Sequence, residues 1–254
     1  MRIAISGTAC QGKTTLIKDF LEQWKDYKTP DKTYRDVIKE NNLEHSSKTN
    51  KKTQLDILNF MIEEQEKYRK DDKVIFDRCP LDNLVYSIWA AEQDDNDIDD
   101  KFVKKCIPLV RESFRNLDII FFTPITKVAP VPVEEDGERD TTIINEIDNL
   151  FKAIHRDHDK NPKTTFFVAD DKPAIIEVFG SRRERIEIIK LYLDGEGDYI
   201  APGNIIDEET LEEFEKLKDA WKDVDPEEHS YIKKEMERQQ KKGTNRQKGK
   251  NRNR

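Results

Sequence analysis

Short apolar runs alternate along the chain with longer stretches in which apolar residues recur every three or four positions. The runs at residues 2–6, 73–77, 117–122 and 164–169 are typical of buried strands. Amphipathic helices are expected between and after them, over residues 14–24, 55–65, 81–91, 102–114, 143–154 and 182–193. This alternation predicts an α/β fold, in which helices cover both faces of a parallel sheet.

The pattern is interrupted near residue 30 and changes beyond residue 203. Pro30 rules out a continuous helix across residues 27–39. Beyond residue 203, Asp207 can cap a helix whose apolar positions end at Trp221, and a polar helix follows. We therefore expect a main domain over residues 1–195, a helical extension over 196–238 and a basic disordered tail over 239–254.

The charge is distributed unevenly between these parts. The formal net charge is −8, but residues 241–254 carry seven Lys or Arg and no acid, which leaves −15 on residues 1–240. An acidic body repels a nucleic-acid backbone, so it gives no support for broad DNA binding. The tail could add a salt-sensitive DNA contact, or it could be a solubilising end.

The cysteines and the N-terminal residues indicate in which cellular compartment the protein is expected. Cys10, Cys79 and Cys106 are odd in number and widely spaced, which argues against a disulfide framework and against a zinc site. The chain starts with a strand-like run instead of a signal sequence, and no apolar stretch approaches the roughly 20 residues that span a bilayer. We expect a cytoplasmic protein without a membrane partner.

Residues 7–14 match the phosphate-loop (Walker A) pattern G-x-x-x-x-G-K-[ST] at every fixed position. The match follows a predicted strand and opens a predicted helix, as a loop that binds phosphate through backbone N–H groups must do. Lys13 would contact the β- and γ-phosphates, and the Thr14 hydroxyl would bind Mg²⁺. The residues expected to contact ATP are Gly7, Thr8, Ala9, Cys10, Gln11, Gly12, Lys13, Thr14 and Thr15.

A second polar element, Asp77-Arg78, ends the strand over residues 73–77. Parallel strands end at one edge of the sheet, so both side chains should project near the phosphate loop. A carboxylate there can take a proton from an acceptor hydroxyl or hold Mg²⁺, and an arginine can stabilise the transferred phosphoryl group or bind an acceptor phosphate. A surface ion pair at a strand end is the alternative.

The phosphate loop, together with residues 74–87, 117–122 and 178–189, resembles the P-loop nucleoside/nucleotide kinase group, in particular its NadR-like AAA-type ATPase/kinase branch. The resemblance covers about residues 1–195. It implies that Asp77 is a base or metal partner and that Arg78 contacts the acceptor or a phosphate. Asp82 and Tyr86 would then line the acceptor side.

The resemblance also implies two further site residues. Arg139 lies at the position of a lid arginine, although its surroundings are unusually acidic for such a lid. Gly180 lies in a loop that passes the adenine ring in that group, or simply begins a helix. Arg35 and its neighbour Tyr34 fall where small kinases often bind their acceptor, but an arginine in a polar stretch is commonly solvated.

We expect an ATP- and Mg²⁺-dependent phosphotransferase that acts on a nucleoside- or nucleotide-like acceptor. One alternative is a phage-type kinase that phosphorylates a hydroxymethylated base within DNA. Another is an NTP-hydrolysing switch without kinase activity, although no N-K-x-D guanine-reading tetrad is present. His155 and His158, at a polar helix end, are expected at the surface. The acceptor and the oligomeric state do not follow from the sequence.

Overall fold

The computed structural model describes residues 1–41, 49–94, 96–126, 141–160, 167 and 172–194. Its elements are β1 Arg2–Ser6, α1 Lys13–Gln23, α2 Tyr34–Glu40, α3 Lys51–Glu66, β2 Val74–Asp77, α4 Pro80–Ala91, α5 Asp100–Ser113, a 3₁₀ turn Phe114–Asn116, β3 Ile119–Phe122, α6 Thr141–Lys160, β4 Ala174–Glu177 and α7 Arg182–Leu193. Within these residues, no helix combines the length and the apolar character that crossing a membrane requires.

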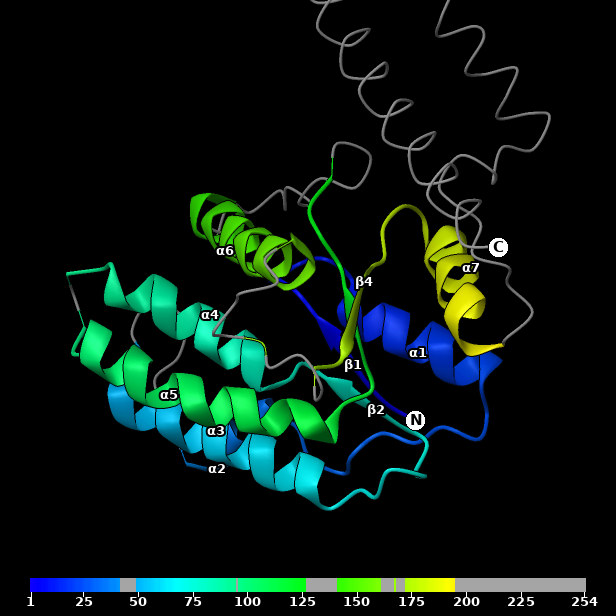
Figure 1. Ribbon diagram of the computed structural model, residues 1–254, viewed down its shortest axis with the longest axis horizontal. Helices are drawn as coiled ribbons and strands as arrows, with labels where there is room; N and C mark the ends of the chain where they lie inside the picture. Colours follow the sequence, from blue (N-terminus) through cyan, green and yellow to red (C-terminus); the bar gives the residue numbers. More distant parts are fainter. Residues whose placement is uncertain (42–48, 95, 127–140, 161–166, 168–171, 195–254) are drawn as a thin grey trace, which may run out of the picture. The chain divides into compact units, whose positions relative to one another are not determined.

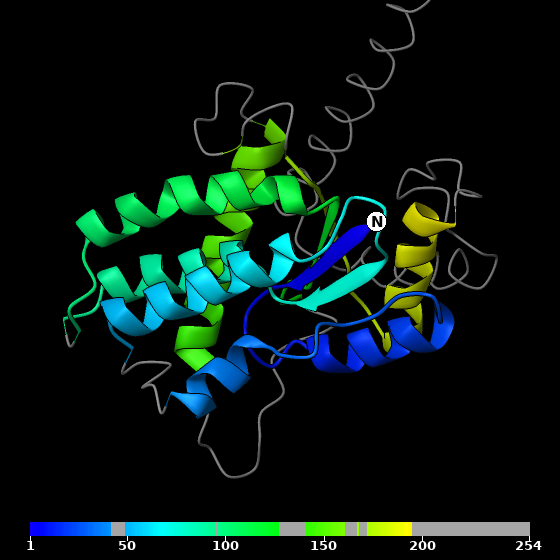
Figure 2. The same ribbon diagram turned by 90° about the horizontal axis from the view of Figure 1, so that it is seen from below.

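The four described strands form one parallel sheet in the order β2-β1-β3-β4. Helices α1 and α7 lie on one face of the sheet, and α3 to α6 lie on the other (Figures 1 and 2). The predicted α/β fold, with helices on both faces of a parallel sheet, is therefore confirmed. The predicted helical extension and tail lie outside the described residues.

The alternation of side chains along β1 separates two hydrophobic clusters. Ile3 and Ile5 pack with residues of α1 and α7, whereas Ala4 packs with residues of α3 to α6. The neighbouring strands follow the same alternation, since Ile3 pairs with Ile75 and Ile119 across the sheet. Strands buried on both faces have near-continuous apolar sequences, which is why β1, β2 and β3 were recognisable.

Strand β4 was not predicted. Residues 174–177 form a half-exposed edge strand that pairs with β3, and an edge strand of this kind lacks a long apolar run. Of the expected strand over residues 164–169, only Phe167 is described. Its ring stacks on Phe114 at 5.1 Å and is buried.

The expectation that His155 and His158 lie at the surface is wrong, because both are buried. The His155 ring packs edge-on against Phe122 at 4.2 Å, and the His158 ring packs edge-on against Phe167 at 4.8 Å. Helix α6 turns this face toward β3, so the two imidazoles belong to the core.

Candidate phosphate and acceptor site

The phosphate loop connects the carboxyl end of β1 to α1, and two of its glycines are required by the backbone. Gly7 has φ +133°, and a Cβ there would lie 2.8 Å from the carbonyl oxygen of Thr123, beyond the end of β3. Gly12 has φ +70° and immediately precedes α1. Within the loop, Cys10 also takes a left-handed conformation with φ +64°.

The N-terminus of α1 is built to receive an anion. Its N-cap is Gly12, so no side chain caps the helix, and its first turn carries no acid that would compete with an anion for the N–H groups. The Gln11 side-chain nitrogen is also buried without a hydrogen-bond partner. This donor set fits the phosphates of ATP.

Lys13 folds back over the loop, where its Nζ donates to the carbonyl oxygen of Thr8. Burial, followed by the positive charge of Arg78, holds the pKa of Lys13 well below its ordinary value. An anion bound in the loop would counter both effects. A phosphate bound in the loop would therefore raise the pKa of Lys13 and favour its charged form.

Asp77 lies beside the loop because the register of the sheet pairs it with Ile5 of β1. Its Oδ2 accepts a hydrogen bond from Arg35 Nη1 at 2.5 Å, while its Oδ1 is buried without a hydrogen-bond partner. Asp77 and Thr14 both line a cavity of about 280 Å³. Two oxygen donors beside a phosphate site fit Mg²⁺, which takes one or two protein ligands together with phosphate oxygens.

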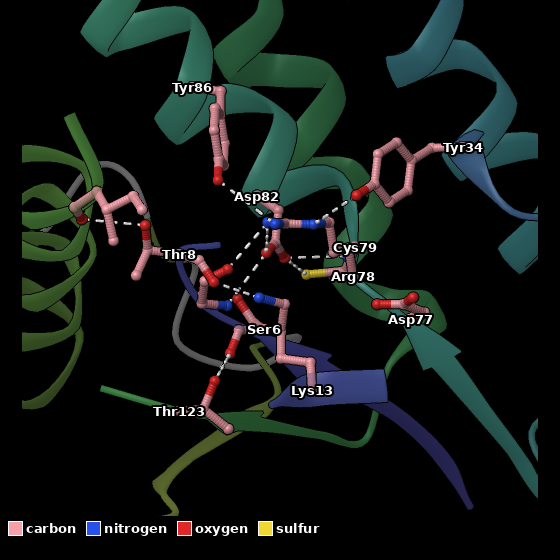
Figure 3. A network of polar contacts seen from close by, with 12 residues as sticks. Ser6, Thr8, Lys13, Tyr34, Asp77, Arg78, Cys79, Asp82, Tyr86 and Thr123 are labelled. Carbon is pink, nitrogen blue, oxygen red and sulfur yellow. Dashed lines mark hydrogen bonds and ion pairs between the residues drawn. The ribbon is translucent and has the colours of Figure 1, made fainter. Parts of the chain in front are cut away.

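Arg78 occupies the centre of the polar network shown in Figure 3. Its Nη1 donates to the Gly7 carbonyl at 2.9 Å and to Asp82 Oδ1 at 3.0 Å. Its Nε donates to the Tyr34 hydroxyl at 3.2 Å, and its Nη2 donates to the Tyr86 hydroxyl at 3.4 Å. Every nitrogen of this buried guanidinium therefore has a protein partner, and the two tyrosine rings flank it.

Asp82 fastens the loop to α4. It is the third residue of the helix, and its Oδ2 accepts from the Cys79 backbone N–H at 3.0 Å as part of a capping box. Its Oδ1 accepts from the Gly7 N–H at 3.1 Å as well as from Arg78. A further contact joins the loop to α6, since the Thr8 hydroxyl donates to the Ile144 carbonyl at 3.0 Å.

A cavity of about 600 Å³ opens beside the loop at Ala9, among α2, α3 and α4. Its lining combines aromatic and apolar side chains with a few polar ones. The described lining residues are Ala9, Tyr34, Arg35, Ile38, Lys39, Thr49, Gln54, Ile57, Met61, Arg78, Asp82, Asn83, Tyr86 and Trp89. A small organic molecule fits a space of this size and composition.

An amide pair lies in the wall of this cavity. Asn83 Nδ2 donates to Gln54 Oε1 at 2.6 Å, and Gln54 Nε2 donates to the Thr49 hydroxyl at 2.8 Å. Asn83 Oδ1 remains buried without a partner. A buried acceptor without a partner is costly unless a ligand supplies a donor.

Gly180 precedes α7 with φ +85° and lies close to the other side of the phosphate loop. Arg185 links the two segments, because its Nη1 donates to the Gln11 carbonyl at 2.6 Å and its Nε donates to the Gly180 carbonyl at 3.0 Å. The loop predicted to pass the adenine ring is therefore joined to the loop predicted to hold the phosphates.

The structure thus brings most of the predicted site residues together, and it adds residues that the sequence did not predict. Residues 7–14, Asp77, Arg78, Asp82 and Tyr86 converge at one edge of the sheet, while Arg139 lies outside the described residues. Sequence reasoning missed Gln54, Asn83 and Arg185. Asn83 lies on α4, most of whose residues are buried, which is a usable signal, whereas nothing in the sequence distinguishes Gln54 or Arg185 from their neighbours.

A family model described as an AAA domain matches residues 2–163. No curated protein matches the chain. Among solved structures, the fold is similar to that of a NadR protein in complex with NR, with a TM-score of 0.53 and 13% identity over 79% of this chain and 53% of that one. It is also similar to deoxyadenosine kinase from M. mycoides with products dCMP and dCDP bound, with a TM-score of 0.53 and 15% identity over 77% of this chain and 100% of that one.

This chain therefore spans about half the length of the NadR protein and the whole length of the kinase. At these identities the likeness concerns the fold. The resemblance to P-loop nucleoside kinases that the motifs indicated is confirmed at that level.

Proposed function

Since this chain belongs to the AAA domain family, we propose that it is an ATP-dependent kinase that transfers the γ-phosphoryl group to a nucleoside- or nucleotide-like acceptor. The observation that carries this proposal is the cavity of about 600 Å³ that opens directly beside the phosphate loop. A kinase needs two adjoining sites, one for the donor and one for the acceptor, and the phosphate loop and the cavity would serve as these two sites at the same edge of the sheet.

The chemistry of the cavity suits a nucleoside-like acceptor. Tyr86 and Trp89 offer aromatic surface to a planar ring, and the unpartnered Asn83 Oδ1 can accept from an exocyclic amino group or a ring N–H. Such an amide selects against a ring that lacks the donor, because the amide oxygen would then stay buried without a hydrogen bond. The two neighbours named above, a NadR protein with NR and a deoxyadenosine kinase, are in agreement with this class of acceptor.

The roles of the site residues follow from their positions. Lys13 and the N–H groups of the loop would hold the phosphates of ATP, and α1 would direct its positive end toward them. Mg²⁺ held by Thr14 and Asp77 would neutralise charge on the phosphates. Arg78 has no free nitrogen, so its role is to position the loop against α4, and it contacts the reacting atoms less directly than the sequence suggested.

The two alternatives make different demands on this geometry. A kinase for a base within DNA needs the same cavity, with a flipped base as its occupant. A switch needs no acceptor cavity, so the amide pair and the aromatic wall would have no role in it. The cavity therefore favours a kinase over a switch.

The test is a transfer assay with γ-labelled ATP and Mg²⁺ against nucleosides, their monophosphates, and DNA with and without hydroxymethylated bases. We expect label on a small molecule, no transfer by Lys13→Met, and turnover reduced more than ATP binding by Asp77→Asn. Label on DNA alone would support the polymer substrate. Label found only in free phosphate would contradict the kinase.

A further inference from the structure

Cations outnumber acids among the described residues that line the acceptor cavity. Three cations line it, Arg35, Lys39 and Arg78, together with a single acid, Asp82. Arg78 and Asp82 are both buried and form an ion pair at 3.0 Å. Their charges compensate each other, so Arg35 and Lys39 remain as the cations that face a ligand.

These two cations lie about one turn apart on α2, and both line the cavity. Residues 1–240 carry a formal charge of −15, so a wall whose described residues include three cations and one acid is a local reversal of the overall charge. In the described part of the chain, Lys39 forms no ion pair, and Arg35 pairs with Asp77 alone. Such a wall attracts an anion and gives a neutral ligand no corresponding contact.

Arg35 can bind an anion without giving up Asp77. Its Nη1 is the only donor engaged with a described residue, and its side chain is 51% exposed. Two of its three nitrogens therefore remain available for a forked contact with a phosphate. Because Asp77 lies beside the phosphate loop, a phosphate held in this way lies next to the position proposed for the γ-phosphoryl group.

We propose that the acceptor is a nucleoside monophosphate and that its own phosphate, held by Arg35 with support from Lys39, is the attacking group. This rests on the kinase function proposed above. A non-bridging oxygen of the acceptor phosphate dianion forms the new bond to the γ-phosphorus. The bond from that phosphorus to the β,γ-bridging oxygen breaks, and its electron pair leaves with ADP. No proton has to be removed from the dianion, so Asp77 serves the metal ion.

The experiment compares each nucleoside with its 5′-monophosphate in the labelled-ATP assay, with the full chain. We expect a higher kcat/KM for the monophosphate, with a nucleoside diphosphate as the product. Arg35→Gln should raise the KM for the monophosphate by roughly 10- to 100-fold, which corresponds to loss of a charge-assisted contact, and should change the KM for ATP by less than about 2-fold. Arg35→Lys should give a KM for the monophosphate between those of the wild type and Arg35→Gln, because lysine keeps the positive charge but cannot make the forked contact of a guanidinium.

Lys105→Gln is the matched control, because Lys105 is an exposed cation of α5 that lines neither cavity. It should leave both KM values unchanged. A nucleoside that is phosphorylated as well as or better than its monophosphate would overturn the inference and leave the kinase standing. An oligonucleotide labelled on a hydroxymethylated base would also overturn it, since attack would then come from a hydroxyl. Transfer to neither class of acceptor would contradict both proposals.

Discussion

At the scale of single residues, the phosphate loop is built around a buried cation and two glycines. Lys13 is buried, and its pKa is lowered by that burial and by Arg78. The sequence predicted that Lys13 and the glycines share a loop, because the pattern has fixed spacing. It did not predict that Arg78 would be enclosed by Tyr34, Tyr86 and Asp82, since those contacts depend on how separate elements pack.

Lys13→Met should stabilise the protein in the absence of ATP, and the gain should depend on pH. Lys13 has a lower pKa in the folded than in the unfolded state, so its buried charge destabilises the fold fully at pH values below the folded pKa. That cost falls as the pH rises from the folded pKa toward the ordinary lysine pKa. Calorimetric Tm values should therefore show the variant's advantage at neutral pH and a smaller one at alkaline pH. An advantage that grows with pH would contradict this account.

Gly7→Ala and Gly12→Ala should differ in cost although both replace a glycine of the same loop. At Gly7 the new Cβ meets the Thr123 backbone at 2.8 Å, whereas at Gly12 the nearest atom is Arg185 Nη1 at 3.6 Å. We expect a loss in the free energy of unfolding of about 2 kcal/mol or more at Gly7 and about 1 kcal/mol at Gly12, where only the left-handed backbone is strained. Urea unfolding of both variants would measure this, and equal losses would refute the close approach.

At the scale of elements, the loop is held in place by the helices around it. Asp82 joins α4 to the loop, Thr8 joins the loop to α6, and Arg185 joins it to α7. The apolar stripes predicted these helices well. They missed α2, whose capping box of Thr33 and Asp36 was a usable signal in a stretch that Pro30 made irregular.

Asp82→Asn tests this attachment. It removes the only ion-pair partner that Arg78 has among the described residues and leaves a buried cation, so we expect a loss of roughly 3 kcal/mol in the free energy of unfolding. Asp56→Asn on α3 is a matched control, because Asp56 also follows its partner Lys52 by four residues but is partly exposed and pairs with an exposed lysine. Its loss should be below about 0.5 kcal/mol. Similar losses in urea unfolding would show that Asp82 does not anchor the loop.

At the scale of the whole molecule, the sequence predicted the order of the strands and helices but not which distant segments come into contact. The alternation of strands and helices predicted the parallel sheet, whose order β2-β1-β3-β4 brings the loops after β1 and β2 to one edge. The cavity of about 600 Å³ combines α2, α3 and α4 with the phosphate loop, and no local pattern predicts that combination. The predictions for Arg139 and for the basic tail lie outside the described residues and remain predictions.

The central claim is that the phosphate loop and the adjoining cavity act together in phosphoryl transfer. The most direct test measures ADP formation from Mg²⁺ and γ-labelled ATP with and without nucleosides and their monophosphates, for the wild type and for Lys13→Met. We predict that one acceptor stimulates ADP formation by the wild type and that the amount of label on this acceptor equals the amount of ADP formed. Lys13→Met should show neither the stimulated ADP formation nor the transfer of label. ADP formation that no acceptor changes, with all of the label in free phosphate, would contradict the claim.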